Sequence, residues 1–155
     1  RNINSVKNAN KAGNAEGELA EIIAHASVMQ AKYGDDVRIV DNVEVQSSTG
    51  WTQGEIDHVA IKDGKVIGAW ETKTGVDNSR EASRELRQAL SYIERNDADK
   101  VTLKGANNID ASQFKHSDEI DEGTIGPAGS DGYDETIALS DSELEEATKS
   151  IRDSE

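Results

Sequence analysis

Three side chains in one short stretch have the types and spacing for metal-assisted chemistry. Asp57 stands near the start of one apolar run, and Glu71 and Lys73 end the next run two positions apart. Because strand side chains alternate with period two, Glu71 and Lys73 are expected to point to the same face. Carboxylates supply the hard oxygen ligands that Mg²⁺ prefers. A lysine beside them can orient a water molecule or offset developing charge, so the set fits hydrolysis of a phosphodiester.

The elements that must position these residues form a predicted β-hairpin. Apolar runs at 56–61 and 66–70 flank an Asp-Gly pair, which is a strong short-range hairpin signal. Both faces of these strands carry apolar residues, which indicates central strands covered on both sides. We expect one face to hold Val59, Ile61, Ile67 and Ala69, and the other Ile56, Ala60, Val66 and Trp70.

The register of the hairpin decides whether the acids meet. A two-residue turn sets Asp57 opposite Trp70, on the face away from Glu71. A three-residue loop closed by a G1 bulge pairs Ile61 with Lys65 instead, and Asp57 then shares a face with Glu71. We therefore predict the bulged turn.

The Asp57 and Glu71-Thr72-Lys73 arrangement, with its Gly-Glu-Ile lead-in at 54–56, resembles the PD-(D/E)XK nuclease superfamily. The superfamily's proline before the first acid is absent here. The resemblance implies a restriction endonuclease-like fold, an α/β three-layer core with a mixed β-sheet flanked by helices. It also implies Asp57 and Glu71 as catalytic ligands of Mg²⁺ or Mn²⁺, the Thr72 carbonyl as a further ligand, and Lys73 beside the attacking water.

A helix is predicted over 14–33, where apolar residues recur at spacings of three and four before Gly34. Superfamily members often bring a glutamate from this helix to the metal, in a Gly-x-x-Gly-Glu-like setting that residues 13–18 resemble. The resemblance implies Glu18 as a catalytic residue and metal ligand, with Glu16 in reserve. The alternative is a solvated glutamate that the helix macrodipole favours.

A second helix is predicted over 79–95. Gln88 and Tyr92 stand four apart in it and are neighbours on its surface. A Gln-x-x-x-Tyr after the Glu-x-Lys strand resembles the extra motif of RecB-type nucleases, which implies that both contact DNA. Arg84, on the Gln88 side, is a candidate phosphate contact, and pairing of the helix arginines with nearby glutamates is the alternative.

Two histidines are given no catalytic role. His58 points with Trp70 toward the core and is interpreted as structural, and His25 is expected on the polar side of its helix. A strand is also predicted over 37–46, with Val37, Ile39, Val43 and Val45 on one face.

The 155 residues divide into a flexible lead at 1–12, a nuclease core at 13–104 and an acidic extension at 105–155. A short strand at 101–103 is expected to follow the second helix and complete the core.

Within the extension, residues 105–133 have little apolar content and are predicted to be a long loop or partly disordered. An edge strand is expected over 136–139. Ser140 or Asp141 then caps a final helix over 143–151.

The net charge is -14, and residues 105–155 carry 3 basic and 14 acidic side chains. Such a composition is typical of proteins from salt-loving organisms, because the Debye length falls to ~3 Å at 1 M salt. The alternative is a functional acidic surface that binds a basic partner. The chain has no cysteine, which excludes thiolate metal sites and disulfides. No apolar run approaches the ~20 residues of a membrane span.

These features together predict a Mg²⁺-dependent endonuclease, with DNA favoured as substrate. An RNA-cleaving toxin of the same fold, acting on tRNA, and a non-catalytic acidic binding module are the alternatives. The polar, Asn-rich lead without an initiating Met is typical of the C-terminal toxin tip of a longer polypeptide, which needs a cognate inhibitor or immunity protein. The sequence leaves open a cytoplasmic or a secreted setting.

Overall fold

The computed structural model describes residues 24–72, 79–105, 109–114, 120–127 and 135–140, with five further positions between 142 and 149. Residues 24–33 are helical. The remaining elements are β1 (Arg38–Ser47), β2 (Thr52–Lys62), β3 (Lys65–Thr72), α2 (Ser79–Arg95), the 3₁₀ turn η2 (Ala98–Lys100), β4 (Val101–Lys104), the 3₁₀ turn η3 (Ala111–Phe114), β5 (Asp121–Pro127) and β6 (Glu135–Leu139).

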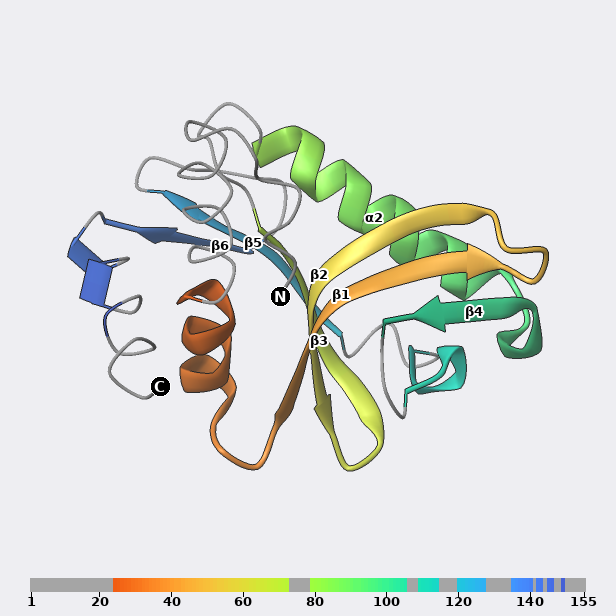
Figure 1. The fold of residues 1–155 in the computed structure, drawn as a ribbon, viewed down its shortest axis with the longest axis horizontal. Helices are drawn as coiled ribbons and strands as arrows, with labels where there is room; N and C mark the ends of the chain where they lie inside the picture. The colour runs from red at the N-terminus through yellow and green to blue at the C-terminus, as the bar shows by residue number, and fades with distance from the viewer. Residues whose placement is uncertain are drawn as a thin grey trace, which may run out of the picture.

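One six-stranded sheet runs through the described residues in the order β4-β1-β2-β3-β5-β6 (Figure 1). The strands β1, β2 and β3 form an antiparallel meander, and β4 pairs antiparallel with β1. After α2 the chain returns to pair β5 parallel with β3, and β6 parallel with β5. The predicted α/β class, with a mixed sheet flanked by helices, is therefore confirmed. No helix in the described ranges is long and apolar enough to cross a membrane.

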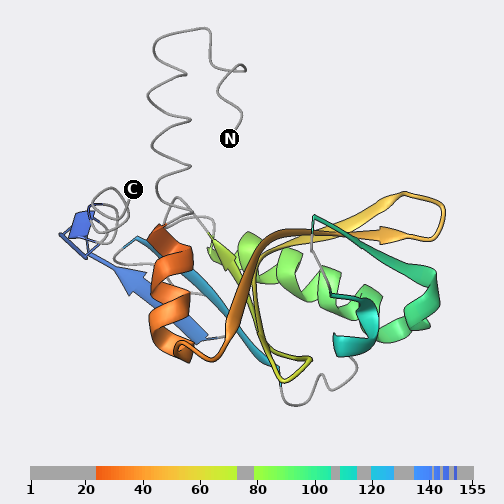
Figure 2. The same cartoon turned by 60° about the horizontal axis from the view of Figure 1, so that its bottom comes forward.

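The short strand expected at 101–103 is confirmed as β4, whereas β5, the second strand after α2, was not predicted. β4 pairs with β1, on the far side of the meander from β3 (Figure 2). The strand beside β3 is β5, inside the segment expected to be a loop. It escaped detection because Ile125 is its only large apolar residue, and small or polar residues such as the fully buried Thr124 fill its other positions. The edge strand expected at 136–139 is confirmed as β6.

Ser140 caps the helical turn that follows β6. Its hydroxyl accepts a hydrogen bond from the Glu143 amide at 3.2 Å, and the Glu143 carboxylate accepts one from the Ser140 amide at 3.2 Å. This reciprocal pair is a capping box, which satisfies two amides that have no partner inside a helix.

The turn between β2 and β3 differs from the prediction. Lys62 pairs with Lys65, so the turn has two residues, and the predicted loop that pairs Ile61 with Lys65 is wrong. Asp63 and Gly64 both lie in the left-handed region, with φ of 53° and 76°. A type I′ turn requires positive φ at both central residues, and it matches the right-handed twist of the strands.

A bulge further along the hairpin restores the alignment of the two acids. The register shifts between Ala60 and Ile61, and Ile67 of β3 is the extra residue. Beyond the shift, His58 pairs with Trp70, which sets the preceding residue Asp57 opposite Glu71. The acids therefore share a face, although the irregularity lies inside the strand rather than in the turn.

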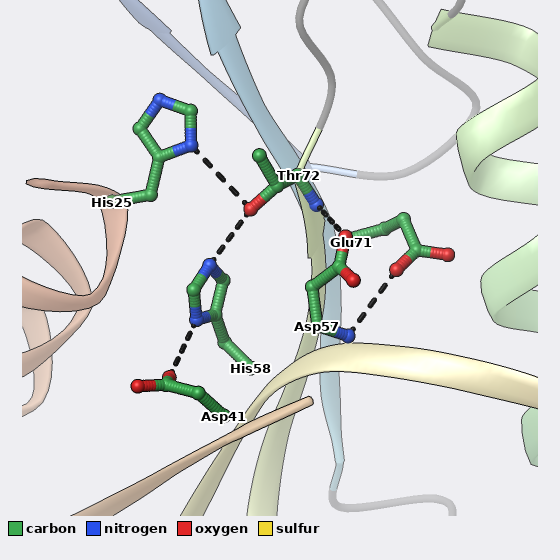
Figure 3. A network of polar contacts seen from close by, with 6 residues as sticks. All are labelled: His25, Asp41, Asp57, His58, Glu71 and Thr72. Atoms are coloured by element: carbon green, nitrogen blue, oxygen red, sulfur yellow. Dashed lines mark hydrogen bonds and ion pairs between the residues drawn. The ribbon is translucent and has the colours of Figure 1, made fainter. Parts of the chain in front are cut away.

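Two apolar clusters cover the two faces of the sheet. The larger one joins β1 to β4 with α2 and η3, and includes Val43, Val45, Ile56, Val59, Ile61, Val66, Ala69, Leu86, Ala89, Ile93, Val101 and Phe114. The smaller one joins the 24–33 helix to β3, β5 and β6 through Met29, Trp70, Ile125 and Leu139. Figure 3 shows the 24–33 helix and α2 on opposite sides of the central strands.

The predicted faces are wrong for Ile39, Ile56 and Val66. Ile39 packs on the smaller cluster, whereas Ile56 and Val66 belong to the larger one. The bulge at Ile67 changes the parity of β3. In β1, Asn42 has φ of 57°, a left-handed conformation that asparagine tolerates. The alternation of side chains between the two faces of the sheet shifts by one residue at this point. Asp57 of β2 lies across from Asn42, between the residue pairs on either side of it.

Candidate active site

The carboxyl groups of Asp57 and Glu71 are each held by a backbone amide of the neighbouring strand. The Asp57 amide donates a hydrogen bond to Glu71 Oε1 at 3.2 Å, and the Thr72 amide donates one to Asp57 Oδ2 at 2.8 Å. One oxygen of each carboxyl group is thus fixed by an amide of the neighbouring strand. The second oxygen of each is the atom that could bind a metal ion, and both side chains lie on the side of the strands that faces α2 (Figure 3).

Glu71 carries its carboxyl group at a buried position, where it is only 4% exposed. Burial raises the pKa of its carboxyl group to about 10, and a hydrogen bond with Asp57 and the charge of Asp57 act in the same direction. The amide of Asp57 opposes the shift only in part. Without a cation nearby, one proton is therefore retained by the pair at neutral pH.

Glu85 of α2 extends this acidic group, and the sequence analysis missed it. Burial raises the pKa of its carboxyl group, and the charges of Glu81 and Asp57 raise it further, against the opposing charge of Arg84. Its charge also raises the pKa of Glu71. A signal was present in the sequence, because Glu85 precedes the core residue Ala89 by four positions and so lies on the same helix face.

Thr72 connects the acid pair to the opposite face of the sheet. Its amide donates to Asp57, and its hydroxyl lies 2.7 Å from His58 Nε2 and 3.4 Å from His25 Nδ1 (Figure 3). His58 Nδ1 in turn lies 2.8 Å from Asp41 Oδ1. The carbonyl of Thr72 remains a predicted metal ligand.

His25 is a correction to the sequence analysis, which placed it in water. It is 1% exposed, because it lies against β3 rather than on the outer side of its helix. Burial lowers the pKa of its imidazole to about 4, and the neighbouring His58 contributes to the shift. His58 and Trp70 share the face predicted for them, and both are buried, 1% and 0% exposed.

The residues predicted to contact nucleic acid take no part in the hydrogen bonds that hold Asp57 and Glu71. Gln88 is exposed and donates a hydrogen bond to the Gln53 carbonyl at 3.4 Å, four residues before Asp57 on β2. Tyr92 is half-buried and packs against the larger cluster. Arg84 is exposed, and it directly precedes Glu85 in α2. All three remain predictions as contacts to DNA.

Three predicted site residues, Lys73, Glu18 and the reserve Glu16, lie outside the described residues. Among the residues that the structure describes, no group of three or more histidine, cysteine, aspartate or glutamate side chains is placed to hold a metal ion. A pair of carboxylates suffices for Mg²⁺, which usually keeps several waters and takes one or two carboxylates together with substrate phosphate.

Comparison of the chain with protein-family models, with curated proteins and with solved structures found no match. The site is therefore interpreted from its own geometry.

Proposed function

We propose that this protein is a metal-dependent endonuclease with a restriction endonuclease-like core, and that Asp57 and Glu71 bind Mg²⁺ or Mn²⁺. The order of elements supports the fold: a helix, three antiparallel strands, α2 and a strand parallel to β3. In this interpretation β4 is an addition at the edge of the sheet.

The observation that carries the proposal is the buried, facing pair of carboxyl groups. Two adjacent acids, each held by an amide of the neighbouring strand and one of them only 4% exposed, destabilise the fold when both are ionised. A divalent cation removes that cost, and carboxylate oxygens are its preferred ligands. The donor set therefore fits Mg²⁺ or Mn²⁺.

The residues of this chain then have distinct roles. Asp57 and Glu71 hold the ion, their orientation fixed by the amides of Thr72 and Asp57. The ion, when bound, polarises the phosphate and lowers the pKa of a bound water. Lys73, two positions after Glu71, orients that water or offsets negative charge in the transition state.

DNA is the proposed substrate because Gln88 and Tyr92 follow the Glu-x-Lys strand with RecB-like spacing. Arg84 is the proposed phosphate contact on the same helix. The Asn-rich lead favours a delivered toxin with a cognate inhibitor, and cleavage of RNA is the alternative within the same chemistry.

Incubation of metal-free protein with plasmid DNA and with total RNA, with Mg²⁺ or Mn²⁺ and then with EDTA, tests the proposal. We expect cleavage that depends on metal, and loss of both metal binding and cleavage in Asp57→Asn. Lys73→Ala should lower turnover by about 10²–10⁴-fold and keep metal binding.

Glu55→Gln is the matched control, since Glu55 is an exposed acid two residues before Asp57 and should leave cleavage intact. If the parent protein binds no metal and cuts neither substrate, the acidic surface is left as a binding module for a basic protein. Full activity in Asp57→Asn would also refute the proposal.

A further inference from the structure

A chain of polar contacts runs through the face opposite the acid pair. It begins at Asp41 Oδ1, passes through both nitrogens of the His58 ring at 2.8 and 2.7 Å, and ends at the Thr72 hydroxyl. The His58 side chain is 1% exposed and that of Asp41 is 40% exposed. The chain therefore connects the surface to the last residue of β3.

When the His58 ring is neutral, one assignment of protons satisfies every contact. Asp41, when ionised, only accepts, so His58 Nδ1 carries the proton and donates it to the carboxylate. His58 Nε2 is then an acceptor and takes the hydrogen bond of the Thr72 hydroxyl. A lone pair of that hydroxyl remains for the Nδ1–H of His25, at 3.4 Å. The Thr72 side chain is thus held from two sides.

The position of this side chain matters for the acid pair because Thr72 serves both faces. The same residue that is held by His58 through its hydroxyl donates its backbone amide to Asp57 Oδ2 at 2.8 Å. Threonine is stiff about χ1, so fixing its hydroxyl also restricts the backbone of the residue. Thr72 is also the residue between Glu71 and Lys73.

We propose that His58 is a positioning residue, which fixes Thr72 through its hydroxyl and thereby holds the Asp57 carboxylate in place opposite Glu71. The consequence for catalysis rests on the proposed function, whereas the consequence for the Asp57 contact does not. Hydrogen-bond partners behind metal-binding side chains typically change metal affinity or activity by about 10–100-fold when they are removed.

Hydroxyl, imidazole and carboxylate in this order also describe a hydrolytic triad. That interpretation is disfavoured because the Thr72 hydroxyl lies between His58 and His25, which are each only 1% exposed. Both sides of the oxygen are taken by imidazole rings, so a substrate carbonyl cannot approach it without displacing one. The geometry suits holding a residue in place rather than attack by its oxygen.

Two matched substitutions separate these contacts. The side-chain nitrogen of asparagine reaches about as far as His58 Nδ1, and that of glutamine about as far as Nε2. His58→Gln can therefore still meet the Thr72 hydroxyl, whereas His58→Asn cannot. Tyr33→Phe is the control, because it removes a part-buried hydroxyl from the same face, one that bonds Trp70 and Asp121.

The first measurement is hydrogen exchange of the Thr72 amide in metal-free protein, corrected for global stability. We expect about 10-fold faster exchange in His58→Asn, a smaller effect in His58→Gln and none in Tyr33→Phe. The second measurement is calorimetric Mn²⁺ binding with steady-state cleavage. His58→Asn should weaken Mn²⁺ binding and lower kcat by about 10–100-fold with KM for nucleic acid unchanged, and His58→Gln should recover part of both.

Equal Thr72 exchange in His58→Asn and Tyr33→Phe would overturn the inference. A parent protein that binds no Mn²⁺ and cleaves nothing would instead refute the proposed function, while the exchange measurement still decides the role of His58. Should His58→Asn fail to fold, Asp41→Ala perturbs the same chain from its exposed end and should also speed the exchange of the Thr72 amide. An unchanged Thr72 amide in that variant would also overturn the inference.

Discussion

Replacing Glu71 by glutamine should make the metal-free protein more stable at neutral pH. The Glu71 side chain is 4% exposed, and burial beside Asp57 raises the pKa of its carboxyl group from 4.5 to about 10. A group with a raised pKa contributes stability that is fully present below its unfolded pKa, and this stability is lost as pH rises toward the folded pKa. Glutamine has nearly the same shape and cannot lose a proton, so it avoids the loss.

The magnitude follows from the interval between the unfolded pKa and the working pH. The unfolded chain releases the Glu71 proton near pH 4.5, and the folded protein retains it at pH 7. At about 1.36 kcal/mol per pH unit, the parent loses roughly 3 kcal/mol over this interval. We expect Glu71→Gln to gain about 1–3 kcal/mol at pH 7 and almost nothing at pH 4.

Urea unfolding of both proteins in EDTA, between pH 4 and 8, measures this difference. Glu81→Gln, at an exposed position of α2, should change stability by no more than about 0.5 kcal/mol. With Mn²⁺ the order should reverse, because binding at 100 times Kd stabilises the parent by about 2.7 kcal/mol and the variant by less. A pH-independent difference, or a variant less stable than its parent at pH 7, would refute the reasoning.

Three further predictions concern packing, the second buried histidine and salt. Gly54→Ala should lower the free energy of unfolding by about 1–3 kcal/mol, since its Cβ would lie 2.9 Å from Ala89 Cβ and 3.2 Å from the helix backbone; an unchanged urea midpoint would contradict this. His25, with a pKa lowered from 6.5 to about 4, contributes stability above pH 6.5 that is lost toward pH 4. Acid titration should show the parent losing roughly 3 kcal/mol more than His25→Gln across that window. The net charge of -14 predicts a higher thermal midpoint in molar KCl than at low salt, and equal midpoints would favour a functional acidic surface.

The hairpin illustrates what the sequence could and could not predict. The apolar runs and the Asp63-Gly64 pair identify two central strands and a turn, and both are present. The pair suits either turn type locally, so the choice between them depends on how the strands pack. The structure combines the tight turn with a bulge at Ile67, a combination that period-two alternation cannot indicate.

The failure to predict the strand β5 and the failure to predict the burial of His25 have a common cause. Both are stabilised by partners distant in sequence, so local pattern carries little of the signal. β5 has few large apolar residues, and β3 and β6, which pair with it on either side, supply its backbone hydrogen bonds. His25 stands outside the apolar stripe predicted for its helix, yet it is buried against Thr72, 47 positions away. Tertiary contacts of this kind override local pattern.

The stability lost by burying Glu71 beside Asp57 is itself an argument that the pair forms a functional site. Burying a glutamate opposite an aspartate lowers stability at pH 7, and an isosteric glutamine would relieve it. The same strand residue, Thr72, holds one of these acids through its amide, while the buried His58, itself in contact with Asp41, holds its hydroxyl. Local violations of the rules of stability tend to occur where function requires them. An unfavourable acid pair that is supported from the opposite face is the observation behind the proposed cation site, because a bound cation would offset the cost of ionising both acids.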